Sequence, residues 1–363
     1  MSNRDSAADY EVVVVGGGPA GLQAALYTTR LGHDTALVDR GGGRAAMMLD
    51  THNVIGVTED TSGNEFLATA TEQVESYGGD VIRDLITEVE QTDDGQFYLE
   101  GNANAFRADR VVLGVGFSDE HPDPPVPRTG KGLHYCLHCD AYMFVDRPVY
   151  VMGAGEAAAH VAMIMLNFTD DVDVLLRGDE PEWSDETDEQ LRAHPIDIVE
   201  ADIDGMNKSD NGWLESFEFE DGSVRQYRGG FAMYGSNYNT ALFETLGCEL
   251  SDDGTVIVDE SMETTVEGVY AVGDITDGHN QIPVAMGKGA QAGIDIHYQL
   301  REFPRDLETI RTEGAVADTD VPAVSNRLRE AAASFEEAQA PPIDTPSPTT
   351  DAEAEAIEPT SDD

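Results

Sequence analysis

Two segments with the order strand, glycine-rich turn and helix limit the possible folds of this chain more than any other feature. The first lies in residues 11–40, where the apolar run VVVV predicts a buried parallel strand that leads into the turn GGGPAG. The second starts near residue 148, where the strand PVYVM leads into the turn GAGEAA. Such turns bring a dinucleotide pyrophosphate to the N-terminus of the helix. The sequence therefore predicts an α/β protein with two Rossmann-like, three-layer nucleotide-binding domains.

The first glycine turn has the residue types and the spacing of a dinucleotide site. Its candidate cofactor-binding residues are Gly16, Gly18, Pro19, Ala20 and Gly21. Gly16 permits the tight turn, Gly18 lets the backbone approach a pyrophosphate, and Gly21 lets the helix pack closely on the strand. Asp39 follows 23 residues after Gly16, at the end of the next predicted strand. A carboxylate at that place can bind the ribose hydroxyls of the cofactor.

A second turn, late in the chain, indicates which dinucleotide the first domain binds. The strand GVYAV ends at Gly273 and Asp274, a pair that would by itself also suit an ordinary β-turn. In two-domain flavoproteins, a strand of this kind brings an aspartate to the ribityl and phosphate region of FAD. Together with the N-terminal glycine turn, the pair predicts FAD as the cofactor of the first domain.

The order of these motifs predicts that the second domain is inserted into the first. The expected units are an FAD-binding domain over 1–117 and 241–302, a pyridine-nucleotide-type domain over 118–240, a C-terminal extension over 303–339, and a disordered acidic tail over 340–363. Within the extension, residues 319–338 are expected to hold one amphipathic helix. Its apolar face would carry Val321, Val324, Leu328 and Ala332.

Two cysteines separated by two residues form the predicted chemical centre. Cys136 and Cys139 can join as a disulfide at the start of a helix, where the helix dipole lowers the pKa of a thiol. His138 between them can stabilise a thiolate, and Asp140 can deliver or accept a proton. Zinc is the competing interpretation, but one short turn cannot surround the ion and no second pair of ligands follows. Cys248 has no partner in the sequence and is expected to be a core residue.

The second glycine turn suits a nicotinamide dinucleotide, but the segment after the next strand specifies it poorly. The turn presents Gly153, Gly155 and Ala158. A 2′-phosphate requires a cluster of cations, and Arg177 here stands alone among acidic side chains. Leu176 offers no carboxylate for the ribose of NAD. NADH and NADPH therefore both remain open as cofactors.

The charge of the chain limits its partners. The sequence has 71 acidic and 21 basic residues, a formal net charge of −50, and the acidic residues are spread along its whole length. This composition is typical of proteins from halophilic archaea, and it argues against nucleic acids or anionic membranes as partners. The sequence also shows no apolar segment long enough to span a bilayer and no signal peptide. A cytoplasmic location is therefore expected.

Over roughly residues 10–300, the chain resembles the low-molecular-weight thioredoxin reductases. The resemblance rests on the segments VVVVGGGPAGLQAALY, CLHCD, MGAGEAAAHVAM and TTVEGVYAVGDITDGHNQ. It implies a homodimer in which the domains rotate, so that the pyridine nucleotide and the disulfide face the flavin in turn. By this resemblance Cys139 lies against the flavin ring, Cys136 attacks the disulfide of a thioredoxin-like protein, and Asp140 acts as acid and base.

The same resemblance places further residues near FAD and leaves the electron donor open. Asn53 and Gln281 match family positions near the flavin, and Arg44 falls where the family commonly has glutamine. Of the arginines that bind the 2′-phosphate in the family, only Arg177 is kept, so NADH or reduced ferredoxin become alternatives to NADPH. A dithiol oxidase that passes electrons to oxygen stays open as a second function. A redox sensor that recruits a partner through its acidic tail is a third.

Overall fold

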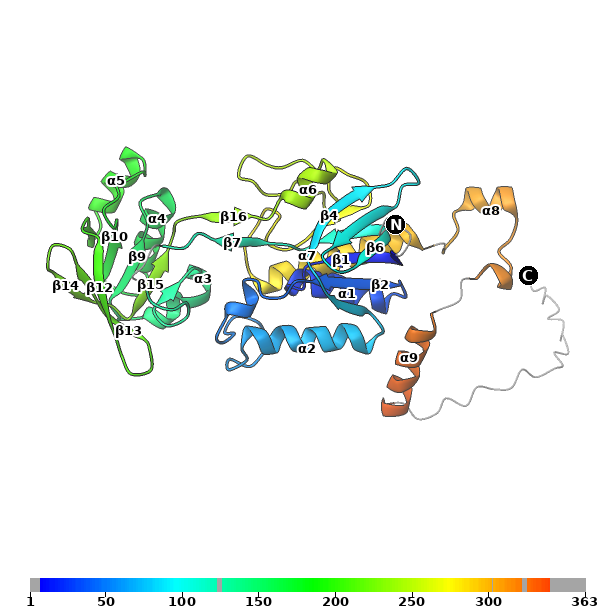
Figure 1. Ribbon diagram of the computed structural model, residues 1–363, viewed down its shortest axis with the longest axis horizontal. Helices are drawn as coiled ribbons and strands as arrows, with labels where there is room; N and C mark the ends of the chain where they lie inside the picture. Colours follow the sequence, from blue (N-terminus) through cyan, green and yellow to red (C-terminus); the bar gives the residue numbers. More distant parts are fainter. Residues whose placement is uncertain (1–6, 123–125, 302, 322–324, 340–363) are drawn as a thin grey trace, which may run out of the picture.

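The computed structural model describes residues 7–122, 126–301, 303–321 and 325–339. These residues form two bodies joined by a pair of extended segments, with two further helices beyond the first body (Figure 1). The acidic tail predicted over residues 340–363 lies outside the described residues. No helix of the described ranges is long and apolar enough to cross a membrane.

The first body is built on a seven-stranded sheet in the order β3-β2-β1-β6-β5-β4, in which β17 also pairs with β6. The parallel strands are β1 (Ala8–Val15), β2 (Thr35–Asp39), β3 (Asp80–Arg83), β6 (Ala105–Leu113) and β17 (Val269–Ala271), and the antiparallel ones are β4 (Ile86–Gln91) and β5 (Phe97–Gly101). The apolar run Val12–Val15 lies in the centre of this sheet and is buried. Because helices and loops cover both faces, the central strands have no polar face, as expected for a parallel sheet.

The long helices of this body are α1 (Pro19–Arg30), α2 (Gly63–Ser76) and α7 (Ile282–Leu300). The helices α1 and α7 pack in close contact, since a Cβ atom at Gly289 would lie 2.1 Å from the backbone oxygen of Ala20. The turn before α7 is equally close to α1, because a Cβ atom at Gly273 would lie 2.8 Å from the Cβ of Ala20. This packing brings the late Gly-Asp turn beside the first glycine turn.

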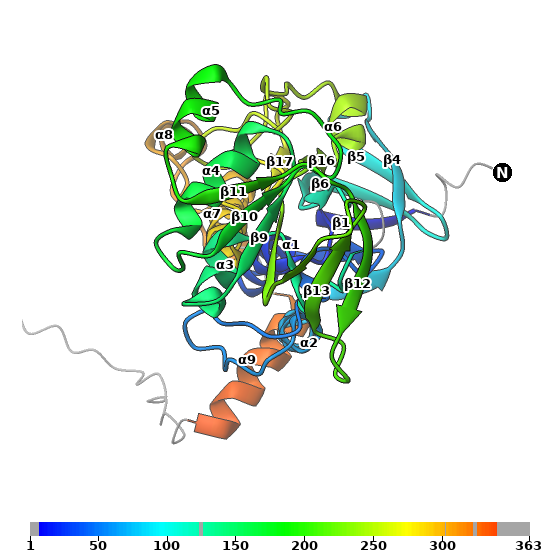
Figure 2. The same ribbon diagram turned by 90° about the vertical axis from the view of Figure 1, so that its left-hand side faces the viewer.

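The second body has a five-stranded parallel sheet in the order β11-β10-β9-β15-β8. Its strands are β8 (Leu133–His134), β9 (Val149–Met152), β10 (Val172–Leu175), β11 (Ile196–Val199) and β15 (Gly229–Ala232). This body also contains a three-stranded antiparallel sheet, made of β12 (Ile203–Lys208), β13 (Leu214–Phe219) and β14 (Val224–Gln226). Its helices are α3 (Leu137–Asp140), α4 (Glu156–Met165) and α5 (Asp185–Arg192). Figure 2 shows the parallel sheet between the helices on one side and the small sheet on the other. The predicted α/β class with two Rossmann-like domains is confirmed.

Two short antiparallel strands join the bodies. They are β7 (Phe117–Asp119) and β16 (Ser236–Tyr238), in which Phe117 pairs with Tyr238 and Asp119 with Ser236. The chain leaves the first body through β7 and returns through β16 to α6 (Ala241–Leu246) (Figure 1). This two-stranded ribbon lies beside the expected domain boundaries after residues 117 and 240, which stay a prediction.

The extension after α7 forms α8 (Leu307–Glu313), a short 3₁₀ turn (Asp318–Asp320) and α9 (Asn326–Gln339). The helix expected over residues 319–338 therefore begins later, at Asn326. Val321 has extended backbone angles, which the residue before a proline prefers, and the sequence places Pro322 next. Val324 lies outside the described residues. Arg327 attaches α9 to the first body through an ion pair of 3.0 Å with Asp80.

Candidate active site

A cavity of about 650 Å³ lies where the two bodies meet. It is lined by the first glycine turn, the loop after β2, the late Gly-Asp turn and the cysteine pair. The predicted site residues in its wall are Gly16, Gly18, Pro19, Ala20, Asp39, Arg44, Asn53, Cys136, Cys139, Asp140, Gly273, Asp274 and Gln281. Residues far apart in the sequence, from four separate segments, therefore share one space.

The first glycine turn leaves room for a bound group at the start of α1. Gly16 has a φ angle of +104°, and a Cβ atom on it would lie 2.5 Å from the oxygen of Gly114. Gly21 packs beneath the turn, where a Cβ atom would lie 2.0 Å from the oxygen of Gly16. At Gly18, by contrast, no atom lies within 4 Å of such a Cβ. The open space at Gly18, directly before the helix N-terminus, fits the pyrophosphate of a dinucleotide.

Two carboxylates lie at the ends of the strands that frame this turn. Asp39 accepts a hydrogen bond of 2.9 Å from the backbone N–H of Gly17, which fixes its side chain at the cavity wall. Burial raises the pKa of Asp274, and the positive charges of Arg44 and Lys288 oppose that shift. Both carboxylates can accept hydrogen bonds from the hydroxyl groups of a sugar or ribityl chain.

Arg44 lines the cavity, but its guanidinium group is also engaged within the protein. Its Nε and Nη2 atoms donate to the two carboxylate oxygens of Asp119 at 2.8 and 3.1 Å. The guanidinium carbon lies 4.7 Å from the ring centre of Phe117. Both partners belong to β7, so Arg44 connects the loop after β2 to the ribbon between the bodies. A direct contact of Arg44 with FAD stays a prediction.

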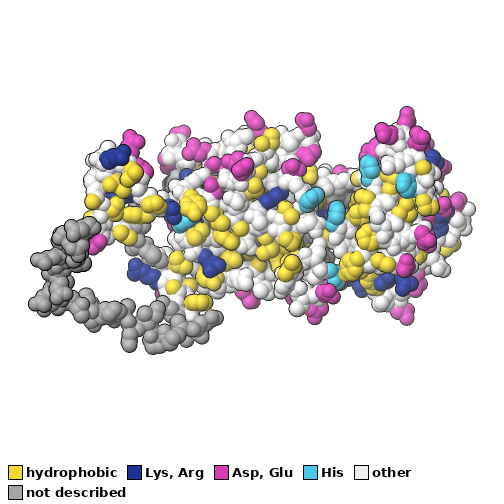
Figure 3. Space-filling model, turned by 180° about the vertical axis from the view of Figure 1, so that it is seen from behind, with side chains coloured by type: hydrophobic (Ala, Val, Ile, Leu, Met, Phe, Trp, Pro, Cys, Tyr) yellow, Lys and Arg dark blue, Asp and Glu magenta, His cyan; other side chains and the backbone are white. Residues whose placement is uncertain are grey.

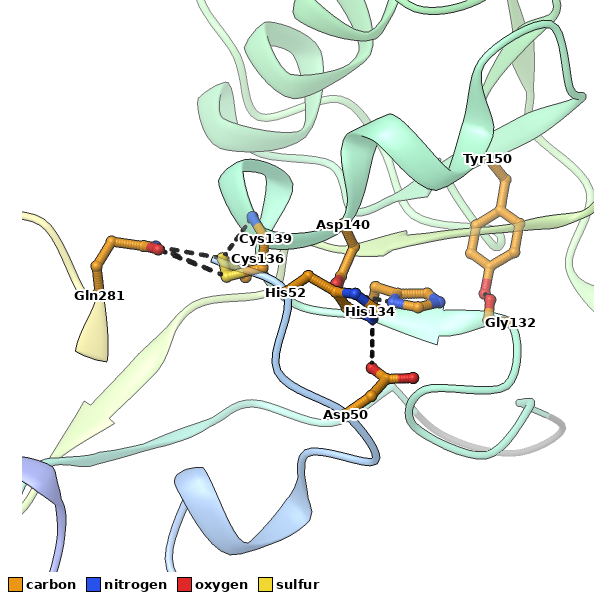
Figure 4. A network of polar contacts seen from close by, with 9 residues as sticks. All are labelled: Asp50, His52, Gly132, His134, Cys136, Cys139, Asp140, Tyr150 and Gln281. Carbon is orange, nitrogen blue, oxygen red and sulfur yellow. Dashed lines mark hydrogen bonds and ion pairs between the residues drawn. A yellow bond between two sulfur atoms is a disulfide. The ribbon is translucent and has the colours of Figure 1, made fainter. Parts of the chain in front are cut away.

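Cys136 and Cys139 form a disulfide in this structure, with an S–S distance of 1.99 Å. Cys136 is the N-terminal cap of α3, and its sulfur accepts the backbone N–H of Cys139 at 3.2 Å. The side-chain amide of Gln281 reaches the pair from the first body and donates to the sulfur of Cys136 at 3.4 Å. Asn53 donates in turn to the amide oxygen of Gln281 at 2.8 Å. The disulfide thus faces the cavity and contacts the first body (Figure 4).

The sequence did not identify His134, which the structure brings into the site. Its Nδ1 atom lies 2.8 Å from the Oδ2 atom of Asp140, and both residues line the cavity (Figure 4). The motif HYCLHCD contains both residues, but only the turn between β8 and α3 shows that they meet. His138, by contrast, is exposed, and its ring centre lies 6.4 Å from that of His279. Figure 3 shows histidine side chains near the junction of the two bodies as well as on each body, and acidic side chains spread over both.

The second glycine turn has the geometry of the first, with space at its middle glycine. Gly153 has a φ angle of +137°, and no atom lies within 4 Å of a Cβ atom built on Gly155. Ala158 is fully buried beneath the turn. The helix N-terminus beyond it differs from the first one, because its first residue, Glu156, is acidic. The Glu156 carboxylate accepts the N–H of Ser184 at 2.6 Å.

The loop after β10 covers this second turn with acidic residues. The backbone N–H of Glu182 donates to the oxygen of Ala154 at 2.7 Å, which holds the loop on the turn. Arg177, the cation expected to bind a 2′-phosphate, has a side chain only 7% exposed and donates to Asp202 at 3.0 Å. The pairing with Asp202 neutralises much of its charge.

Cys248, the third cysteine, is a free thiol in the core of the first body. Burial raises the pKa of this thiol, which makes it less reactive. The expectation that Cys248 is a core residue is confirmed.

The cysteine pair shares a cavity with one dinucleotide turn, and the body that carries the pair has a second such turn. This arrangement is that of a two-nucleotide disulfide oxidoreductase. The chain belongs to the pyridine nucleotide-disulphide oxidoreductase family, whose model matches residues 10–289. Membership of this family implies FAD and a nicotinamide cofactor. The predicted class, a flavoprotein disulfide reductase, is thereby confirmed.

Individual relatives show the same class. The chain is 30% identical over 311 residues to a thioredoxin reductase of Peptoclostridium litorale, in a match that covers 81% of this chain and 98% of the relative. It is 29% identical to one component of the alkyl hydroperoxide reductase of Staphylococcus epidermidis, and the match covers 58% of that component. Among solved structures, the thioredoxin reductase of Streptococcus pyogenes superposes with a TM-score of 0.74 at 25% identity, covering 82% of this chain and 99% of that one.

Proposed function

We propose that this protein carries electrons from FAD to the Cys136–Cys139 disulfide and on to thioredoxin or a similar dithiol carrier. The observation that carries the proposal is the cavity in which the disulfide and the first glycine turn share one wall. The contact of Gln281 with the sulfur of Cys136 supports the same assignment, because it shows the disulfide against the first body. The names of the relatives from Peptoclostridium and Streptococcus point to thioredoxin as the carrier.

The residues proposed to hold FAD belong to the first body, and we assign the FAD-binding domain to 1–117 and 241–302. Gly16, Gly18 and the N-terminus of α1 would bind the pyrophosphate, while Asp39 and Asp274 would bind hydroxyl groups of the ribose and the ribityl chain. FAD, when bound, supplies the pair of electrons that reduces the disulfide. The second body, to which we assign the pyridine-nucleotide-type domain 118–240, carries the cysteine pair and the second nucleotide turn.

The reduced cysteine pair then passes its electrons on by thiol–disulfide exchange. The Cys136 thiolate attacks the carrier disulfide, breaks its S–S bond and forms a mixed disulfide. Cys139 attacks the sulfur of Cys136, which restores the enzyme disulfide and releases the reduced carrier. Asp140, at the end of α3, gives a proton to the departing carrier thiolate. His138 lies between the cysteines, where a positive charge stabilises a thiolate.

The surroundings of the second glycine turn disfavour NADPH as the electron donor. Arg177 is paired with Asp202, and the loop that carries Glu182 lies on the turn. A 2′-phosphate placed there would meet negative charge and little free positive charge. We therefore propose NADH or reduced ferredoxin as the alternatives to NADPH. The homodimer, the cytoplasmic location and the halophilic origin stay predictions from the sequence.

Anaerobic titration of the flavin absorbance with NADH, NADPH and reduced ferredoxin tests the donor. The compound that bleaches the flavin at stoichiometric amounts is the electron donor. Bleaching by NADPH first would contradict the assignment made from Arg177 and Glu182. Turnover with thioredoxin disulfide should follow, and it should stop in the Cys136→Ser and Cys139→Ser variants. The matched control is Cys248→Ser, which removes the third cysteine and should keep turnover. Rapid oxygen consumption with a small dithiol, without thioredoxin reduction, would instead show a dithiol oxidase.

A further inference from the structure

The pairing of His134 with Asp140 has a role that follows from its geometry. We propose that His134 is the positioning residue of Asp140: it holds one carboxylate oxygen, so that the other oxygen exchanges protons with the cysteine and carrier sulfurs. The inference rests on the proposed function, in which Asp140 is the acid and base of the thiol–disulfide exchange.

His134 is held rigidly at the end of β8. Its side chain is 4% exposed, and its ring lies edge-on to Phe144, with the ring centres 5.3 Å apart. Phe231 on β15 lies next to both rings, with ring centres 6.1 Å from His134 and 5.5 Å from Phe144. The Asp140 side chain is 24% exposed and reaches the cavity. A fixed ring therefore contacts a carboxylate that is still open to the sulfurs and to a carrier.

The hydrogen bond itself indicates where the proton of the imidazole lies. The Nε2 atom of His134 is buried and has no hydrogen-bond partner within the described ranges. Because an ionised carboxylate only accepts hydrogen bonds, the ring nitrogen that faces Asp140 carries a hydrogen, and an Nε2 atom without an acceptor needs none. Nδ1–H therefore donates to Oδ2 of Asp140. A group that fixes a proton-transferring residue in this way is typical of catalytic sites.

The protons and electrons of the exchange balance with this pair in place. The reduced enzyme begins with a Cys136 thiolate, a Cys139 thiol and a protonated Asp140. Attack of Cys136 on the carrier disulfide releases one carrier thiolate, which takes the proton of Asp140. Cys139 then gives its proton to Asp140 and attacks Cys136, and the second carrier thiolate leaves with that proton. The carrier gains two electrons and two protons, and Asp140 ends as a carboxylate that accepts Nδ1–H.

Other titratable groups lie near the pair. Asp50 and His52, 2.9 Å apart, approach it from the loop of the first body (Figure 4). Tyr142 follows α3, and its pKa is raised by burial and by the charges of Asp50 and Asp140. The exposed His138 precedes the second cysteine on the same turn. All four of these neighbours are left unchanged in the test.

Two variants of His134 separate positioning from a general effect on the fold. The amide nitrogen of His134→Asn lies near the place of Nδ1 and can still donate to Asp140. The amide nitrogen of His134→Gln lies near the place of Nε2 and cannot. Both side chains are polar and no longer than histidine, so the two variants disturb the packing around position 134 in similar ways. His33→Gln is the matched control, because His33 is also buried and pairs with a carboxylate, Glu11, at 3.3 Å.

The FAD-loaded protein is reduced with dithionite under anaerobic conditions, which avoids any dependence on the natural donor. It is mixed with oxidised thioredoxin between pH 5.5 and 9, and carrier dithiol is measured per bound flavin. His134→Gln should react about 10-fold more slowly, with the alkaline limb of its profile moved to higher pH. The exchange begins with a protonated Asp140, and the lost hydrogen bond had favoured the ionised carboxylate. His134→Asn should stay within about threefold of the wild type, and His33→Gln should match it.

The outcomes distinguish the inference from the function on which it rests. Equal rates and equal pH profiles for the Asn and Gln variants of His134 would overturn the positioning role. Asp140→Asn is measured in the same assay. If Asp140→Asn reacts as fast as the wild type, the proposed role of Asp140 fails. If it is slow while His134→Gln is unaffected, the inference about His134 fails alone.

Discussion

Replacing Arg44 by methionine should destabilise the protein because it leaves a buried carboxylate without its partner. Arg44 donates two hydrogen bonds to Asp119, whose side chain is only 7% exposed, whereas the Arg44 side chain is 26% exposed. Methionine keeps most of the apolar stem but removes the charge and both bonds. Asp119 would then lie in β7 with no cation beside it, at the ribbon that joins the two bodies.

The expected loss follows from the burial of the pair. Breaking a fully buried ion pair on one side costs about 3–5 kcal/mol. Because Arg44 is partly exposed and water can reach its place in the variant, about 3 kcal/mol is expected here. Asp119→Asn leaves the more exposed partner behind and should cost about 1–1.5 kcal/mol. The double variant should lose about 2 kcal/mol of unfolding free energy. This is roughly 2 kcal/mol less than the sum of the two single losses, and the difference is the coupling energy between Arg44 and Asp119.

The free energy of unfolding is measured by denaturant titration at one fixed salt concentration, because the net charge of −50 makes stability depend on screening. Thermal unfolding provides a second reading, in which a loss of about 3 kcal/mol corresponds to roughly 6–12 °C. Arg192→Met is the control. Arg192 pairs with Asp188 on the exposed surface of α5, where solvent screens the two charges and little stability is lost with the pair.

Additive losses in the double variant, to within about 0.5 kcal/mol, would refute this reasoning, since they would show that Arg44 and Asp119 do not stabilise each other. An Arg44→Met variant no less stable than Arg192→Met would refute it as well.

Three further predictions concern the first body. Gly21→Ala should lower the flavin-to-protein absorbance ratio of the purified protein, because its methyl group would lie 2.0 Å from a backbone oxygen of the turn and relieving the clash costs about 1–3 kcal/mol. Cys248→Ala should keep thioredoxin turnover, while the thiol count of the reduced, unfolded protein falls from three to two. His297→Gln should make stability less dependent on pH. Burial and the charge of His33 lower the pKa of His297 below its usual 6.5. As the pH falls, His297 therefore becomes protonated in the unfolded state before it does so in the folded state. Stability present above about pH 6.5 is lost as the pH falls, and denaturant midpoints between pH 7.5 and 5.5 should show a smaller loss in the variant.

The parts of the fold that the sequence predicted are those whose signals are local. The run Val12–Val15, the turn at Gly16 and the helix after it lie within one stretch of chain, and each follows from residue type and spacing alone. The same holds for Cys136 and Cys139, whose separation of two residues permits the disulfide that the structure contains. The extension was predicted less well, since the helix begins only at Asn326.

What the sequence could not show are contacts between distant segments. Arg44 and Asp119 are 75 residues apart, and nothing in either segment predicts that they pair. Arg177 was recognised as a lone cation, but its pairing with Asp202 depends on the arrangement of β10 and β12. His134 lies only six residues before Asp140, yet their contact requires a chain reversal that residue types do not specify.

The ribbon of β7 and β16 bears on how such a protein can evolve. Because the two strands pair side by side, the chain leaves and re-enters the first body at neighbouring points. The segment between these points is therefore an insertion whose two ends lie side by side. Substitutions within such an insertion need not change the sheet of the first body. The glycine turn at Gly16 can then stay under selection for one ligand while the loop after Arg177 diverges. Under the proposed function, selection could in this way change the electron donor without altering the site at the first glycine turn.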